Sequence, residues 1–201
     1  MNARVDLLTE VEMYQHFEAG IRGGMCFVKT YFVEAHNTET VHGHMHPREQ
    51  NYISYWDENN LYGNALRQRL PCGEFQWMTE DEWTAINWQT VDVEGVCGYA
   101  LKVDLSYPQE LHERTKDFPL APVSTTVSED MFTCYMRDQW QVRSEIRHQP
   151  FKTEKKLLMT CYDKIEYVVH FKLLQFYLNM GMQNSFNHQI QTRPHLPGLH
   201  R

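Results

Sequence analysis

Residues 98–108 place the strongest limit on what this chain can fold into. They read GYALKVDLSYP, in which apolar and polar side chains alternate up to Pro108. Because successive side chains of a strand point to opposite faces, this alternation predicts a β-strand. Pro108 cannot donate to a strand ladder and marks the end. Residues 164–171, KIEYVVHF, predict another strand, and residues 172–181 predict a helix that ends at Gly181.

Two capping boxes mark the starts of further helices. Thr9 with Glu12 opens a predicted helix with apolar side chains at helical spacing, and Gly20 suits the left-handed position after its end. Thr79 with Glu82 opens a second, short helix. We also expect strands over residues 25–35 and 51–57, a polar loop between them, and a short helix over 60–70.

Composition and charge narrow the class of protein. The chain has 201 residues, of which 42% are hydrophobic, so it can form one packed domain or part of a larger one. We expect an α+β fold. The net charge of −7 argues against nucleic-acid binding through bulk electrostatics. Because the sequence has neither a signal-peptide pattern nor a membrane-length apolar run, we expect a soluble intracellular protein without a membrane partner.

The stretch over residues 52–63, YISYWDENNLYG, brings one carboxylate to the end of an apolar run. In a strand, Ile53, Tyr55 and Asp57 would share a face, and the asparagines that follow could cap the next helix. A carboxylate beside helix amides suits a divalent metal that carries phosphates. The alternative is that Asp57 is only a polar strand terminator, because strand-to-helix turns often contain Asp and Asn.

The DENNLYG segment resembles motif A of family B DNA polymerases, in particular the protein-primed branch carried by viruses and by Polinton/Maverick transposons. Further segments resemble that branch in the same order. IRGG, at residues 21–24, is similar to its template-binding loop, and RLPCGEFQW, at residues 69–77, is similar to the stretch after motif A. Residues 98–123 and 156–182 also resemble family segments, so the resemblance covers about residues 5–182.

The resemblance implies roles for the residues of motif A. Asp57 would be the catalytic metal ligand for the incoming nucleotide, and the backbone carbonyl of Glu58 would be a second oxygen donor. Backbone amides at Asn60, Leu61 and Tyr62 would hold the triphosphate. Tyr62 would also pack beneath the sugar and exclude a ribose 2′-hydroxyl.

The resemblance assigns the loop at residues 21–24 to the template strand. Arg22 would supply charge, and Gly23 and Gly24 would allow a close approach to the strand backbone. The loop departs from the family at Ile21, where the family has Tyr. Motif A has Asn60 and Gly63 where the broader family has Ser and Pro, and both are usual in the transposon branch.

The resemblance also implies an architecture, cofactors and partners. Residues 1–70 would be part of an antiparallel polymerase palm with the loop and motif A. Residues 71–182 would be the insertion after motif A, including Asp104, and the start of the return to the palm. Residues 183–201 would be a divergent polar tail, and their low apolar content and two prolines predict no core role. The intact enzyme would add deoxynucleoside triphosphates to a DNA template-primer with two Mg²⁺ ions and a priming protein.

Motif B and motif C of the family are not found in the 201 residues. We therefore expect a polymerase fragment that is inactive alone. Two alternatives stay open: a non-catalytic module that binds DNA or the priming protein, and a decayed transposon relic.

Two groups of side chains have competing interpretations. His42, His44 and His46 could form a metal site, but a histidine-bearing variable loop is the favoured interpretation because no Cys or acid stands at ligand spacing. Trp77, Trp83 and Trp88 could stack on bases, although their spacing favours packing in the core and at its rim.

Overall fold

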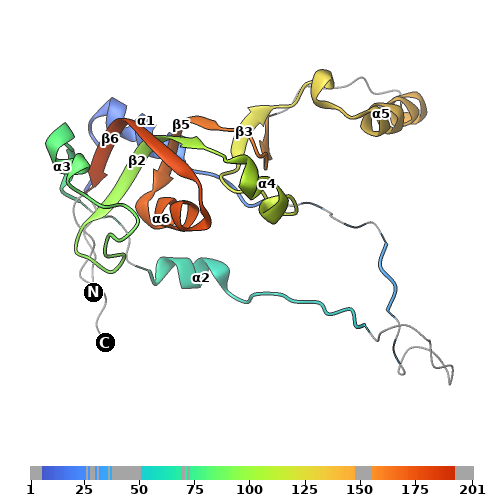
Figure 1. Ribbon diagram of the computed structural model, residues 1–201, viewed down its shortest axis with the longest axis horizontal. Coiled ribbons are helices and arrows are strands. Elements are labelled where there is room, and N and C mark those ends of the chain that lie inside the picture. Colours follow the sequence, from blue (N-terminus) through green and yellow to red (C-terminus); the bar gives the residue numbers. More distant parts are fainter. Residues whose placement is uncertain are drawn as a thin grey trace. The chain divides into compact units, whose positions relative to one another are not determined.

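The computed structural model describes residues 6–25, 27, 30, 32–35, 37, 51–68, 71, 73–147 and 155–192, with the side chains of 185–192 excepted. The chain divides into two compact units (Figure 1). One consists of Met1–Met25 with Pro71–Arg201, and the other is Cys26–Leu70. We call them the sheet unit and, after the residues 57–63 that resemble motif A, the motif A unit.

Helices and antiparallel strands are mixed along the chain, which confirms the predicted α+β class. The helices are α1 (Val11–Gly20), α2 (Leu61–Leu66), α3 (Glu80–Thr84), α4 (Gln109–Thr115), the 3₁₀ helix η1 (Glu129–Met131), α5 (Cys134–Arg147) and α6 (Phe171–Met180). The strands are β1 (Phe75–Trp77), β2 (Gly98–Ser106), β3 (Val123–Thr126), β4 (Lys155–Leu158), β5 (Lys164–His170) and β6 (Gln183–Thr192).

A four-stranded antiparallel sheet organises the sheet unit. Its strand order is β1-β6-β2-β5, so β5 lies at one side of the described sheet. The predicted strands over 98–108 and 164–171 are its β2 and β5, and Leu101 of β2 lies opposite Val169 of β5. The strands β3 and β4 form a separate two-stranded antiparallel sheet.

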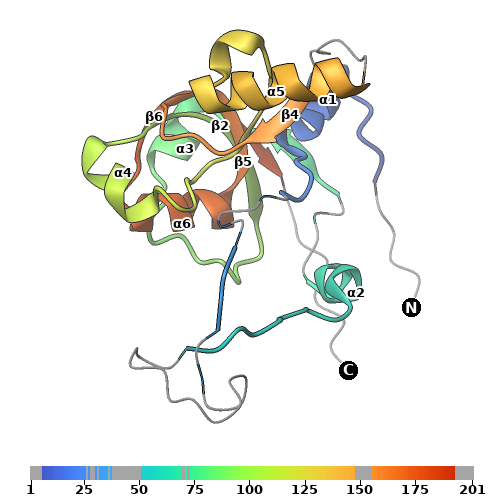
Figure 2. The ribbon, with the colours of Figure 1, turned by 90° about the vertical axis from the view of Figure 1, so that its right-hand side faces the viewer.

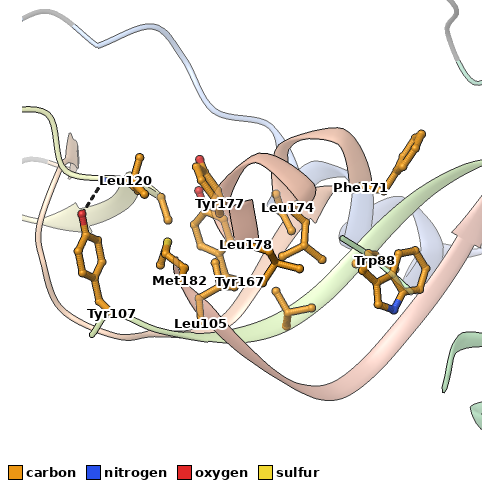
Figure 3. Close-up of a cluster of buried hydrophobic side chains, with 14 of the residues drawn as sticks. Trp88, Leu105, Tyr107, Leu120, Tyr167, Phe171, Leu174, Tyr177, Leu178 and Met182 are labelled. Atoms are coloured by element: carbon orange, nitrogen blue, oxygen red, sulfur yellow. Dashed lines mark hydrogen bonds between the residues drawn. The ribbon is translucent and has the colours of Figure 1, made fainter. Parts of the chain in front are cut away.

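The main core lies between the sheet and α6 (Figure 3). Leu101 and Val103 of β2 are fully buried, and Phe171 and Leu174 of α6 pack in the same cluster. The helix α1 packs on the opposite face of the sheet (Figures 1 and 2). There, Nε2 of His16 lies 3.3 Å from the carbonyl oxygen of Ala100. The two faces of β2, which the alternation predicted, therefore face different helices, α6 on one side and α1 on the other.

Tyr107 closes the end of this core. Its hydroxyl accepts a hydrogen bond of 3.1 Å from the backbone N–H of Leu120 and also contacts the hydroxyl of Thr115 (Figure 3). Its backbone N–H donates to the Asp163 carboxylate at 2.6 Å. These bonds satisfy the polar groups of a tyrosine that is almost fully buried.

Local helix signals have mixed outcomes. The capping box at Thr79 is confirmed, because the Glu82 carboxylate accepts from the Thr79 backbone N–H at 2.9 Å. Gly181 ends α6 with φ 112°, as predicted. The capping box at Thr9 is wrong: Glu10 is the N-cap of α1, and no side chain caps this helix. Gly20 is the last helical residue and not a left-handed residue after the helix.

The polar segment after Gly181 forms a strand that the sequence did not predict. In β6, Gln189 lies opposite Leu101 of β2, and Ile190 lies opposite Trp77 of β1. The predicted tail therefore contributes a strand to the sheet, whereas the expectation that its side chains have no core role stays a prediction. Pairing on both sides uses main-chain groups, which any sequence other than proline can supply.

Candidate functional site

The segment that leads to Asp57 is not a strand. Residues 51–58 have no regular secondary structure, and the predicted strand over 51–57 is wrong in this structure. The described residues of 25–35 likewise contain no strand, and almost all of the predicted loop at 36–50 lies outside the described residues. A strand needs a neighbouring backbone to pair with, and no strand is described in the motif A unit.

The aromatic side chains before Asp57 are solvent-exposed. Tyr55 is 93% exposed and Trp56 is 89% exposed, and the Asp57 side chain is exposed as well. The carboxylate is therefore accessible to a ligand. Tyr55 and Trp56 expose large apolar surfaces close to it in the chain. Such exposure is unusual for aromatic side chains of this size.

A tight turn connects Asp57 to the helix α2, which begins at Leu61 within the predicted range of 60–70. Asn60 is the N-cap residue and has a left-handed backbone with φ 58° and ψ 41°. Asparagine tolerates this conformation better than most residues do. Its side chain makes no capping hydrogen bond, so the predicted role of the asparagine as a side-chain cap is wrong.

Gly63 provides room for the Asn60 side chain. A Cβ at Gly63 would overlap the Asn60 amide group, with Cγ of Asn60 only 2.7 Å away. The side chain of the left-handed Asn60 therefore packs directly against Gly63. A larger residue at position 63 would require the Asn60 amide to move, which the rotation of this side chain allows.

The large side chains that follow Asn60 in α2 are also exposed. Tyr62 is 89% exposed, and Leu61 and Leu66 are largely exposed too. These apolar side chains of α2 are therefore not packed against residues described in the motif A unit. The ring of Tyr62 is free to contact a ligand or another protein surface.

The residues around Asp57 do not make a complete site for two Mg²⁺ ions. The described part of the chain contains no group of three His, Cys, Asp or Glu side chains that could hold a metal. Asp57 and the Glu58 carbonyl can supply hard oxygen ligands, but Mg²⁺ carried by a nucleotide at a two-metal centre needs further acidic positions. The described residues therefore fit part of such a centre only.

The loop after α1 belongs to the sheet unit, and Arg22 is its best-anchored residue. Its Nη1 donates to the carbonyl oxygens of Gly20 at 3.1 Å and of Val168 at 2.7 Å. Its guanidinium carbon lies 3.9 Å from the centre of the Tyr167 ring. Burial raises the pKa of the Tyr167 phenol, whereas the charge of Arg22 acts in the opposite direction.

Gly23 and Gly24 follow in open space. Both are exposed, and a Cβ on either would meet nothing within 4 Å. Their backbone is accessible from outside. Asp57 and α2 belong to the motif A unit, whereas Arg22–Gly24 belong to the sheet unit. The geometry of each group is therefore given only relative to its own unit.

The remaining sequence candidates are structural where they are described. Trp88 is buried in the core and Trp83 packs against it, which confirms the packing interpretation. Trp77 lies at the rim, and its Nε1 donates to the Glu10 carboxylate at 2.9 Å. In β2, the Asp104 carboxylate accepts a 2.7 Å hydrogen bond from the backbone N–H of Glu166. His42, His44 and His46 lie outside the described residues.

Sequence reasoning missed Tyr167 as the partner of Arg22. The strand pattern of 164–171 places Tyr167 and Val169 on one face, which could have predicted that the ring enters the core. Nothing in the sequence indicates that the loop at 21–24 reaches this ring, because the contact joins residues 145 positions apart in the chain.

Comparisons with known proteins add no relative. No protein-family model, curated protein or solved structure matches the chain. Across the described ranges, no helix has both the length and the apolar character that a membrane crossing needs.

Proposed function

We propose that this chain is part of a protein-primed family B DNA polymerase and contributes motif A to templated addition of deoxynucleotides. The observation that carries the proposal is the DENNLYG segment, in which an exposed Asp57 precedes a left-handed turn and a helix that begins at Leu61. The other resembling segments, in family order, support it. The proposal comes from sequence resemblance, and the local geometry is compatible with it.

In this proposal Asp57 and the Glu58 carbonyl contribute metal ligands, and amides at Asn60, Leu61 and Tyr62 hold the triphosphate. When bound, the two Mg²⁺ ions of the family enzyme neutralise charge on the transferred phosphate. The exposed Tyr62 ring would lie against the sugar of the nucleotide. The template strand would contact the loop that contains Gly23 and Gly24, and a priming protein would be the further partner.

A graft tests the proposal without requiring the chain to act alone. Residues 52–63 would replace motif A of an intact protein-primed family B polymerase, and primer extension would be measured with Mg²⁺ and all four deoxynucleotides. We expect synthesis from the graft and none from the same graft with Asp57→Asn. A graft that folds but remains inactive would overturn the assignment of motif A.

The same graft tests the sugar contact. With Tyr62→Ala, incorporation of ribonucleotides should rise relative to deoxynucleotides, while Tyr55→Ala, at another exposed tyrosine of the graft, serves as the control. Unchanged sugar selection would remove Tyr62 from the proposed site.

The chain itself should not extend a primer, since motifs B and C are not found in its sequence. Sustained templated synthesis by the purified chain would show that this expectation is wrong. The result would leave the motif A assignment intact, because the graft measures that assignment separately.

A non-catalytic binding module is the second candidate. The exposed Tyr55, Trp56 and Tyr62 favour it, since aromatic side chains are common at protein interfaces and can also stack on bases. Binding of primed DNA or of the priming protein, with no activity in the graft, would support this candidate. Absence of binding and of activity would favour a decayed transposon relic.

A further inference from the structure

Arg22 ties the loop at residues 21–24 to the edge of the sheet. Nη1 carries two hydrogens, and the Gly20 and Val168 carbonyl oxygens accept hydrogen bonds from this nitrogen. Val168 belongs to β5, which lies at one side of the described sheet. The arginine side chain is half-buried in this position.

The platform beneath the guanidinium is itself fixed. Tyr167 is almost completely buried, and its hydroxyl donates to the Pro122 carbonyl oxygen at 3.2 Å. The centre of its ring lies 6.4 Å from the centre of the Tyr177 ring in α6. An arginine stacked on an aromatic face and bonded to carbonyls is held more tightly than one at a free surface.

The two glycines after Arg22 are not explained by the fold. Neither has a positive φ, and neither lies against another atom at the Cβ position. Gly20, by contrast, packs closely, because a Cβ there would approach Cγ1 of Val168 to 3.2 Å. The open glycines leave main-chain N–H groups that a phosphate backbone could approach.

We propose that Arg22 is a positioning residue whose clamp on β5 and Tyr167 holds the Gly23–Gly24 backbone toward the phosphates of a single DNA strand. The inference rests on the proposed function for the identity of this ligand. In this inference Arg22 does not form an ion pair with the template. It anchors Gly23 and Gly24, and these two residues contact the template.

Binding of a fluorescent single-stranded oligodeoxythymidylate by the full chain, measured across a range of salt concentrations, separates the two roles. If Arg22 acts by position, Tyr167→Leu and Arg22→Met should each weaken binding about threefold to tenfold. The salt dependence should stay unchanged in both. Tyr167→Phe should bind nearly like the wild type, because it keeps the ring that contacts Arg22 and loses only the hydrogen bond to Pro122. Arg114→Ala controls for loss of an exposed arginine.

A direct phosphate contact gives a different result. Arg22→Met would then reduce the slope of log affinity against log salt by about 0.7, as expected for one contact on a single strand. Tyr167→Leu would leave affinity unchanged, since a buried tyrosine cannot reach the strand. Either outcome would overturn the inference.

Limited proteolysis tests the clamp without DNA. Trypsin must take an arginine side chain into its specificity pocket, so the clamp should protect the Arg22–Gly23 bond. Tyr167→Leu should accelerate this cleavage about threefold to tenfold relative to cleavage after the exposed Arg67. Equal rates in the wild type and the variant would overturn the inference even if Tyr167→Leu binds DNA poorly through partial unfolding.

The two measurements keep the inference apart from the proposed function. A protected Arg22 with no oligonucleotide binding by the wild type would overturn the proposed template contact, and with it the presentation of the glycines to DNA. Oligonucleotide binding without protection of Arg22 would overturn the clamp and leave the proposed function standing.

Discussion

The sheet unit and the segment around Asp57 use similar residues in opposite ways. In β2 and α6, apolar side chains such as Leu101 and Phe171 are almost fully buried. In residues 52–56, equally apolar side chains face solvent, and Trp56 is 89% exposed. The difference teaches that an apolar run becomes a strand only where a second backbone pairs with it. The motif A segment has the composition of a strand, but no strand among the described residues pairs with it.

The largest expected effect tests this contrast with matched aromatic truncations. Phe171→Ala should lower the free energy of unfolding by about 3–5 kcal/mol, because it leaves a cavity and removes an edge-on contact with Tyr99. Trp56→Ala should change it by less than about 0.5 kcal/mol. Urea denaturation measures both. A cost above about 2 kcal/mol for Trp56→Ala would mean that the ring is buried in solution, which would contradict the comparison.

The fold was most predictable where local pattern and tertiary contact agree. Residues 98–108 and 164–181 predicted β2, β5 and α6, because their apolar side chains meet in one core. At Thr9 a tertiary contact changed the local outcome, since Glu10 becomes the N-cap of α1 and bonds Trp77. The strand β6 was not predictable, because its place depends on main-chain pairing with β1 and β2.

The candidate site was predictable only in part, for the same reason. The exposed position of Asp57 and a helix beginning near Leu61 follow from the local sequence. The contact between Arg22 and Tyr167 joins residues far apart in the chain. A motif can identify a residue, but only the fold determines whether its side chain is available.

A pair of glycine substitutions gives the next largest effect and compares a glycine that the fold needs with one that it does not. Gly181→Ala should cost about 1–2 kcal/mol of stability, because an alanine at φ 112° is strained and its Cβ would approach Leu111 Cδ2 to 3.2 Å. Gly24→Ala should cost less than about 0.5 kcal/mol. Thermal unfolding of both variants measures the difference, and equal losses would contradict this assignment.

The turn before α2 offers a smaller, local test within the motif A unit. Asn60→Val should destabilise the left-handed turn by about 1 kcal/mol, because a β-branched side chain is strained at φ 58°. Asn60→Gly should retain the turn. NMR Cα chemical shifts of Leu61–Leu66 report helix population independently of global stability. Retained helix in the valine variant would show that Asn60 does not determine where α2 begins.

The smallest effect is a pH dependence expected from the sheet unit. Burial of His16 between α1 and the sheet lowers its pKa, the bond to the Ala100 carbonyl raises it, and nearby Lys102 lowers it again. The pKa of His16 is lower in the folded chain than in the unfolded chain. As pH falls below about 6.5, the unfolded chain therefore binds more protons at His16 than the folded chain does. The free energy of unfolding should therefore be unaffected by His16 protonation above that pH and decrease below it. His16→Gln should flatten the difference in unfolding free energy between pH 7.5 and pH 5.5. An identical pH profile in the wild type and His16→Gln would show that another group carries the acid sensitivity, and that the α1 face tolerates a charged imidazole.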